Sequence, residues 1–304
     1  MTSAFRTTRR TKELLRREIP GTAGVLADPH DFAAMRRYRT FPFQDHTRYL
    51  RQLEDHLRTR TAQGMRTSLA LFDPAAFAEY CAELGIDPDS IDSRARYTAE
   101  LAGTGATLPY AGEPLPQLLP LLVEETGRQA VRDTAATRLA DAGTCRECGE
   151  DLSHSAFALA TQVLKELLDG LGDGTHHLVC SIPTGPPPLL AALRVTSEKG
   201  RHSLGESQSL TFCTVLAAGI AHRTPGGIVS RSTRPEPRPE DTATPHDTVR
   251  GWALRDGWPE PLTAAQVFTA YCTDAETGDP IPPEPQVDHT EGFPLNRPPE
   301  THHC

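Results

Sequence analysis

Two cysteines separated by two residues are the clearest chemical feature of the sequence. Cys145 and Cys148 lie in the stretch TCRECGED, with a glycine directly after the second thiol. A tight turn that ends in glycine brings two thiolates to the same side, which is half of a tetrahedral zinc site. The spacing therefore predicts a structural zinc ion; a dithiol redox pair and unliganded cysteines are the alternatives.

The remaining ligands must come from residues that the fold returns to this turn. A helix over 154–170 carries the chain away by about 24 Å, and a strand over 175–180 returns it by roughly 17–20 Å, which brings Cys180 close. His154 needs no distortion, because it follows Cys148 by only six residues. In an extended strand His177 and Cys180 point to opposite faces. The predicted ligands are Cys145, Cys148, Cys180 and His154, with His177 or His176 as alternates to the last.

Two aspartates form a second candidate site. The segments GVLADPHDFAAMRRY (24–38) and SLALFDPAAFAEYCA (68–82) share an apolar run, an Asp-Pro pair and a phenylalanine three residues after the proline. Asp28 and Asp73 are expected to cap helices that follow two buried strands. If these strands are parallel neighbours, the carboxylates converge at the sheet edge on a divalent cation or a polar substrate. Capping alone explains both residues without a catalytic role.

Alternating short strands and helices position these candidates. Apolar runs predict strands near 25–27, 69–72, 106–110, 176–182 and 226–232, and helical periodicity predicts helices near 46–64, 74–84, 92–102, 116–142, 154–170 and 206–222. Such alternation favours an α/β fold with a mostly parallel sheet and flanking helices, into which a zinc-knuckle-like insertion is built.

Composition divides the chain into three parts. Residues 1–143 form an α/β region with the repeated strand-AspPro-helix unit, and residues 144–230 form a zinc-stapled helix-strand region packed on the same core. Residues 231–304 contain 13 of the 27 prolines and are expected to be an acidic, largely irregular tail, since such a segment buries too little apolar surface to offset its ordering entropy. An ordered island near 249–272 should dock on the core through a helix capped by Thr263.

Charge is distributed unevenly along the chain. Residues 1–60 hold 13 Lys and Arg against 7 Asp and Glu, although the whole chain carries a net charge of −9. Nucleic-acid binding through the basic side chains of this segment is not favoured, because a solvated helix face explains them equally well. These residues are Arg6, Arg9, Arg10, Lys12, Arg16 and Arg17. With no run of 18 apolar residues, neither a membrane span nor an export signal is expected. We therefore expect reduced thiols in the cytoplasm.

Motifs that would name a reaction are missing from the sequence. It contains no glycine-rich phosphate loop of the required spacing, no G-x-S-x-G elbow and no H-E-x-x-H pair. The first functional hypothesis is a cytoplasmic zinc-binding regulatory protein that acts through a protein partner. The second is a metal-assisted hydrolase or phosphoryl-transfer enzyme that uses Asp28 and Asp73. The sequence does not decide whether the protein is an enzyme.

Overall fold

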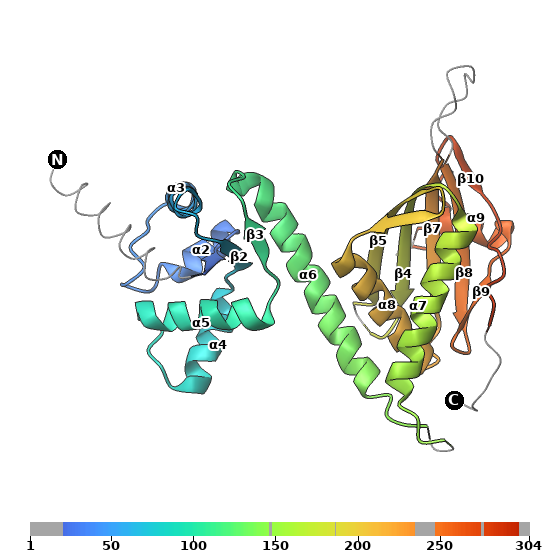
Figure 1. The fold of residues 1–304 in the computed structure, drawn as a ribbon, viewed down its shortest axis with the longest axis horizontal. Coiled ribbons are helices and arrows are strands. Elements are labelled where there is room, and N and C mark those ends of the chain that lie inside the picture. The colour runs from blue at the N-terminus through green and yellow to red at the C-terminus, as the bar shows by residue number, and fades with distance from the viewer. Residues whose placement is uncertain (1–20, 146–147, 186, 235–246, 275–276, 298–304) are drawn as a thin grey trace. The chain divides into compact units, whose positions relative to one another are not determined.

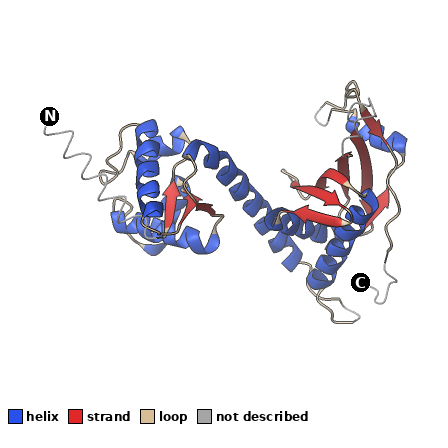
Figure 2. Cartoon of the chain, turned by 45° about the horizontal axis from the view of Figure 1, so that its top comes forward, coloured by secondary structure: helices blue, strands red, loops and turns tan. Residues whose placement is uncertain are grey.

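The computed structural model describes residues 21–145, 148–185, 187–234, 247–274 and 277–297. Contacts divide the chain into two compact units, Met1–Gln129 and Ala130–Cys304. The helix α6 (Leu115–Ala140) begins in the first unit and ends in the second. Figure 1 shows the elements of both units, and Figure 2 shows that the longer strands belong to the second.

The first unit contains a small mixed sheet of order β1-β2-β3. Strand β1 runs parallel to β2, and β3 runs antiparallel to β2. The strands span Thr22–Val25, Thr67–Leu71 and Leu108–Tyr110. The helices that accompany them are α2 (Pro29–Met35), α3 (His46–Ala62), α4 (Pro74–Leu84) and α5 (Ile91–Thr104).

Local sequence accounts for the ends and the buried faces of these helices. Asp45 and Ser90 cap α3 and α5 by accepting hydrogen bonds from backbone N–H groups of the first turn, and Gly85 ends α4 in the left-handed conformation at φ 63°. On α3 the residues at four-residue spacing face the core and are buried: Tyr49, Leu53 and Leu57. Together with rings from α2, α4 and α5 they form the first hydrophobic core.

The second unit is built on a seven-stranded sheet of order β10-β8-β7-β4-β5-β6, with β9 paired to β8. All pairs are antiparallel except β10 with β8. Its strands are β4 (Gly174–Ile182), β5 (Leu189–Glu198), β6 (Arg201–Leu204), β7 (Gly226–Thr233), β8 (Asp247–Arg255), β9 (Trp258–Pro261) and β10 (Val287–His289). Its helices are α7 (Leu152–Leu171), α8 (Glu206–Ala221) and α9 (Ala264–Tyr271).

Helices α7 and α8 cover one face of this sheet and form the second hydrophobic core (Figure 1). Alternate residues of β4 and β5 are buried beneath them, as the period of a strand with one covered face requires. Helix α8 is buried over most of its surface, from Thr211 to Ile220. Among the described helices, none combines the length and the apolar composition needed to cross a membrane.

The prediction of a mostly parallel sheet is wrong. Parallel strands need a crossover of a dozen or more residues, usually a helix, whereas β5 and β6 are joined only by Lys199 and Gly200. Both turn residues have positive φ, 52° and 72°, as a type I′ hairpin turn requires. Asp256 and Gly257 repeat this arrangement between β8 and β9, with φ values of 47° and 76°. The second sheet is therefore built mainly from hairpins.

Residues 247–271, which include the island expected near 249–272, form two strands and a helix. Strand β7 pairs along its full length with β8, and Val249 and Trp252 of β8 are fully buried. Two prolines of this segment, Pro259 and Pro261, lie on the short strand β9. An edge strand such as β9 tolerates the missing N–H of proline. The expected helix is confirmed: Thr263 caps α9, and Val267 of that helix is buried. Contacts with distant residues thus bury part of this segment, and its proline-rich composition does not reveal them.

Strands β5 and β6 occupy residues to which the sequence prediction assigned no element. Helix α6 runs continuously through Pro120 and Gly127. Asp151 caps α7, and its carboxylate accepts a hydrogen bond from the Ser153 N–H at 2.9 Å.

Candidate functional site

The CxxC segment forms a closed hairpin turn between α6 and α7. Thr144 pairs with Asp151 as an isolated antiparallel bridge. Inside the bridge the Cys145 N–H donates to the Glu150 carbonyl at 2.8 Å, and the Gly149 N–H donates to the Cys145 carbonyl at 2.9 Å. Gly149 has φ 75°, the left-handed conformation that favours glycine. These backbone hydrogen bonds close the turn, and Gly149 supplies the left-handed residue in it.

A second turn of the same design contains no cysteine. Thr273 pairs with Pro280, the Asp274 N–H donates to the Asp279 carbonyl at 2.8 Å, and the Gly278 N–H donates to the Asp274 carbonyl at 2.9 Å. Gly278 also has φ 75°. Asp274 takes the place of the first cysteine and Thr277 the place of the second. Because this turn closes without thiols, the spacing and the glycine of a CxxCG segment do not by themselves indicate a metal ion.

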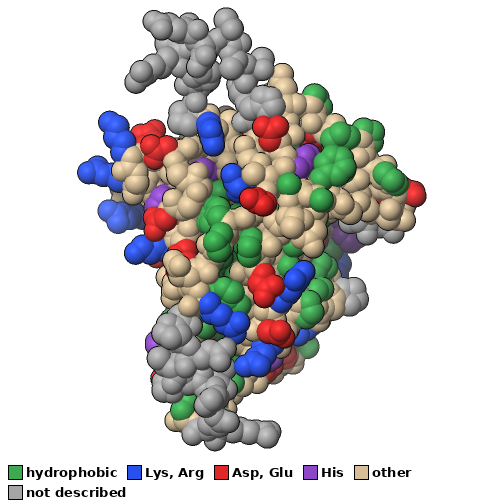
Figure 3. Space-filling model, turned by 90° about the vertical axis from the view of Figure 1, so that its right-hand side faces the viewer, with side chains coloured by type: hydrophobic (Ala, Val, Ile, Leu, Met, Phe, Trp, Pro, Cys, Tyr) green, Lys and Arg blue, Asp and Glu red, His purple; other side chains and the backbone are tan. Residues whose placement is uncertain are grey.

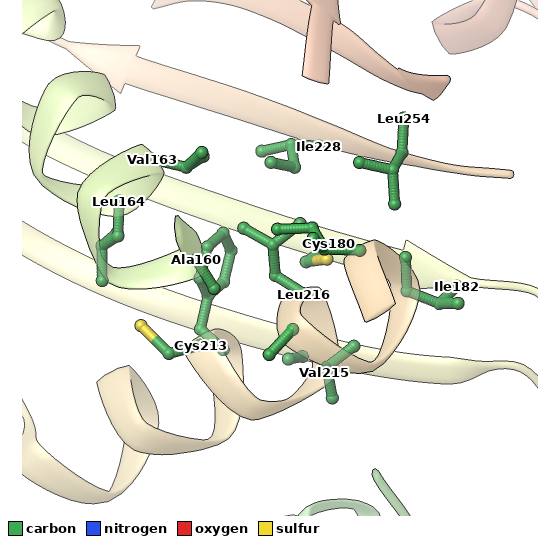
Figure 4. Packing of buried hydrophobic residues seen from close by; sticks show 14 of the residues in the cluster. Ala160, Val163, Leu164, Cys180, Ile182, Cys213, Val215, Leu216, Ile228 and Leu254 are labelled. Carbon is green, nitrogen blue, oxygen red and sulfur yellow. The ribbon is translucent and has the colours of Figure 1, made fainter. Parts of the chain in front are cut away.

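The third predicted thiol lies inside the hydrophobic core. Cys180 is fully buried on β4, and Figure 4 shows its sulfur among the apolar side chains of Ile228 and Leu216. Burial raises the pKa of this thiol far above its ordinary value, which disfavours the thiolate that a zinc ion requires. His154, the fourth predicted ligand, is exposed in the first turn of α7.

The alternate histidines separate as strand geometry requires. His177 is exposed, whereas Cys180 is buried beneath the helices, which confirms that the two residues point to opposite faces of β4. His176 is buried, and both of its ring nitrogens are engaged: Nδ1 lies 2.9 Å from the Ser232 hydroxyl and Nε2 lies 3.0 Å from the Gly172 carbonyl. Using it as a ligand would break one of these contacts.

Within the part of the chain that the structure describes, no group of three or more His, Cys, Asp or Glu residues is placed to hold a metal ion. The hypothesis of a zinc-binding regulatory protein is therefore wrong, and so is the hypothesis of a metal-assisted enzyme. The physical reason is that Cys180 contributes to the core instead of returning its sulfur to the turn. Cys145 and Cys148 stay a predicted pair of ligands that lacks its other half.

Asp28 and Asp73 lie where the sequence predicts, at adjacent strand ends. Val25 pairs with Leu71 in the parallel ladder of β1 and β2; Asp28 comes three residues after Val25 and Asp73 two residues after Leu71, at the starts of α2 and α4. Both act as helix caps: Asp28 accepts from the His30 N–H at 2.6 Å, and Asp73 from the Ala75 N–H at 2.7 Å.

Asp31 joins the two caps electrostatically. Partial burial raises the pKa of its carboxyl, and the neighbouring charges of Asp28 and then Asp73 raise it further. The three carboxylates therefore share one edge of the first sheet, although they make no metal site. The basic residues from Arg6 to Arg17 that were considered for nucleic acid lie outside the described residues.

The second sheet presents a face that α7 and α8 do not cover. Directly paired residues of adjacent strands share a face, so Ala192 of β5, Val179 of β4, Val229 of β7 and Gly251 of β8 form one row across it. A side chain at Gly251 would meet Leu262 and Val267, which shows that α9 and its preceding turn cover this face above β8. We call the part on β5, β4 and β7 the uncovered face.

The uncovered face has an apolar end and a polar end. Leu190 of β5 is 52% exposed there, which is unusual for a large apolar side chain on a strand, and Ala192 beside it is also exposed. The next row along the strands consists of Arg194, His177 and Arg231. On this face, exposed apolar side chains thus lie next to a row of arginine and histidine side chains.

Only part of that base row is available to a ligand. Arg231 pairs with Asp247 at 2.6 Å and with Glu284 at 2.8 Å, and its guanidinium also contacts the Tyr271 hydroxyl at 2.9 Å. These acceptors, the Asp247 carboxylate first, raise the pKa of Arg231. Arg194 and His177 are exposed, and no described residue offers either side chain an ion pair or a hydrogen bond. Arg194 is thus an unpaired cation of this face among the described residues, and His177 is an exposed imidazole whose charge acts on Asp247.

Strand β5 also has a largely unpaired outer edge. Strand β4 pairs with Leu189–Ser197 on one side, whereas β6 pairs only with Val195–Glu198 on the other. Over the described residues, no backbone hydrogen bond joins the outer side of Leu189–Leu193 to another segment. The sequence prediction missed this strand because LLAALR is apolar at consecutive positions. Apolar residues at both buried and exposed positions were the available signal.

Charges of both signs are interspersed with hydrophobic side chains on the side of the molecule shown in Figure 3, so the net charge of −9 does not form a single-sign surface there. Comparison with known proteins gives a limited result. The profile of a family described as a domain of unknown function (DUF8829) matches residues 8–113, a little over a third of the chain. No curated protein and no solved structure matches.

Proposed function

We propose that this chain is a polypeptide-binding protein whose C-terminal unit receives a segment of another protein on the uncovered face of its sheet. The observation that carries the proposal is the 52% exposure of Leu190 beside Ala192, on a strand whose buried residues already fill the core beneath α8. A contiguous exposed apolar patch, in contrast to scattered apolar residues, can mark an interaction surface.

The chemistry of the partner follows from the neighbours of these apolar groups. Arg194 carries a charge without an ion pair among the described residues, and His177 lies in the same row on β4. A partner that buries Leu190 must lie across or beside this row. We therefore infer that the recognised segment combines apolar side chains with a carboxylate, because a guanidinium binds a carboxylate through two parallel hydrogen bonds.

The proposal keeps the expected cytoplasmic location and needs no metal. The six described cysteines, at positions 81, 145, 148, 180, 213 and 272, are free thiols. Asp28 and Asp73 enter the proposal only as helix caps of the N-terminal unit.

The test uses a defined pair of variants and a random peptide library displayed on phage. Leu190→Asp places a charge on the uncovered face, and Leu84→Asp is its matched control, because Leu84 is 56% exposed at the end of α4 in the other unit. The library is selected on the full chain. We expect enriched peptides that bind the Leu84 variant as well as the natural chain and bind the Leu190 variant at least tenfold more weakly. A selection without enriched peptides, or with peptides insensitive to Leu190→Asp, contradicts the proposal.

A further inference from the structure

We infer that the partner binds as an added strand along the outer edge of β5, over Leu189–Arg194; this inference rests on the proposed function. The bound segment would extend the order of the sheet by one strand in the space that β6 leaves open. Its side chains on the uncovered face would lie beside Leu190, Ala192 and Arg194.

The direction of the β5 main chain supports this binding mode. The Arg194 N–H donates to the Gln208 side-chain carbonyl at 3.3 Å, so it points away from β4 and towards the outer edge. In an antiparallel strand the N–H and C=O groups of residues two apart point to the same side. The main-chain groups of Leu190 and Ala192 therefore also point outwards. They form a row of donors and acceptors that no described segment satisfies.

These groups identify the occupant as an extended polypeptide. Outward N–H and C=O groups repeat along β5 at about 6.6–6.8 Å for every two residues, which is the repeat of another strand. Proteins usually protect such an edge with lysine, proline or a bulge. The stretch LLAAL (189–193) contains no charged residue and no proline; Pro187 and Pro188 lie before it.

Strand β6 limits the length of the added strand. Leu204 pairs with Val195, so a segment running along β5 from residue 189 meets β6 after Arg194. About six residues fit in this space, which is the length of an ordinary strand. A side chain directly opposite Arg194 lies about 4.5–5.5 Å away between Cβ atoms, within reach of a carboxylate. The inferred motif is a short strand with apolar residues at alternate positions and Asp or Glu at the end beside Arg194.

A second copy of this chain fits the edge less well. Antiparallel pairing of two β5 strands about Ala192 places each Arg194 opposite a Leu190, which leaves both guanidinium groups without a carboxylate. The β6 strand of each copy also stops the pairing after five residues, from Leu190 to Arg194. We therefore assign the edge to a different polypeptide and treat self-association as an outcome of the experiment.

The experiment separates the edge from the face by removing one N–H group. Ala192→Pro deletes an outward donor and no bond to β4, and proline is tolerated on edge strands. Ala192→Val is the matched control, because it keeps the N–H and enlarges the side chain. With the peptides selected above as probes, we expect at least a tenfold loss of affinity in the proline variant and less than a threefold change in the valine variant. Equal binding by both variants overturns strand addition and leaves the proposed function standing.

Two further readouts keep the test decisive if the proline variant folds poorly. On the natural chain, saturating peptide should slow amide hydrogen exchange at Leu190 and Ala192 at least tenfold; unchanged exchange there overturns the inference. The Arg194→Glu variant should bind peptides that carry the carboxylate more weakly than the natural chain does. It should bind the same peptides when the acidic residue is changed to lysine. A third outcome would overturn both proposals. If the natural chain binds no peptide, sediments as a dimer and becomes monomeric in the Ala192→Pro variant, the edge binds a second copy of the chain.

Discussion

Gly149 and Gly278 occupy equivalent positions in two turns that differ in chemistry. One turn has thiols at the first and fourth positions, and the other has Asp274 and Thr277. Both glycines have φ 75°, and a Cβ atom added at either would meet nothing within 4 Å. At the scale of single residues, backbone conformation thus explains the glycine without a metal ion.

The two turns provide a matched test of what stabilises the CxxC segment. Gly149→Ala and Gly278→Ala should each lower the free energy of unfolding by about 1–2 kcal/mol, because each places a non-glycine residue in the left-handed region. Cys148→Ser, at an exposed position, should change it by less than about 0.5 kcal/mol. Denaturant titration measures all three values. A loss in Cys148→Ser that exceeds the loss in Gly149→Ala, together with zinc in the purified chain by mass spectrometry, would restore the thiols as ligands.

His176 links stability to pH at the same scale. Burial lowers the pKa of its imidazole below 6.5, so the folded state holds this side chain neutral where the unfolded state begins to bind a proton. Its contribution to stability is therefore complete above about pH 6.5 and is lost as pH falls towards the folded pKa. Between pH 7 and 5, His176→Gln should lose stability less steeply than the natural chain. Equal slopes in the two chains would contradict this assignment.

At the scale of elements, β5 combines one saturated edge with one open edge. The residues whose N–H groups face β4 form a ladder hydrogen bond, and those that face outwards do not, except at Arg194 and where β6 pairs. The same strand supplies the apolar row of the uncovered face. The proposed binding surface is thus a property of one strand and of the short length of its neighbour β6.

This asymmetry predicts a pattern of amide hydrogen exchange in the unliganded protein. The N–H groups of Ala191 and Leu193 face β4 and should exchange slowly, because they open only with the sheet. Those of Leu190 and Ala192 face outwards and should exchange at least a hundredfold faster. Two-dimensional nuclear magnetic resonance resolves the four residues. Slow exchange at all four would show that the outer edge is already paired.

At the scale of the whole molecule, the C-terminal segment completes the second unit. The buried Trp252 of β8 donates its indole N–H to the Phe293 carbonyl at 2.9 Å and packs its ring edge-on against the Phe293 ring. Phe293 also packs against Gly170 near the end of α7, and the Asn296 N–H donates to Glu166 of that helix at 2.7 Å. Residues 293–296 therefore tie β8 to α7.

Truncation of Trp252 tests that role. Trp252→Ala removes a fully buried ring and should lower the free energy of unfolding of the C-terminal unit by about 3–5 kcal/mol. Phe268→Ala is the control, since that ring is 44% exposed on α9 and its loss should cost less than about 1.5 kcal/mol. The fluorescence of Trp258, which remains in the same unit, reports the transition. Equal effects of the two changes would mean that Trp252 does not anchor this segment.

The sequence by itself determined the features that depend on neighbouring residues. The caps at Asp28, Asp73 and Thr263, the helical periodicity of α3 and α7, and the alternation of His177 and Cys180 all follow from hydrogen bonds or side-chain spacing within a few positions. The two-residue turns at Lys199 and Asp256 carried a readable hairpin signal as well, since each is followed by glycine.

Only the tertiary structure decided which distant segments meet and which surfaces remain free. The sulfur of Cys180 contributes to a core formed by α6, α7, α8 and five strands of the second sheet, and no local rule separates a buried thiol from a ligand. The length of β6 leaves the β5 edge open, and the position of α9 leaves part of the sheet face uncovered. Strand pairing and burial depend on contacts between residues far apart in the chain, so composition and spacing did not predict them.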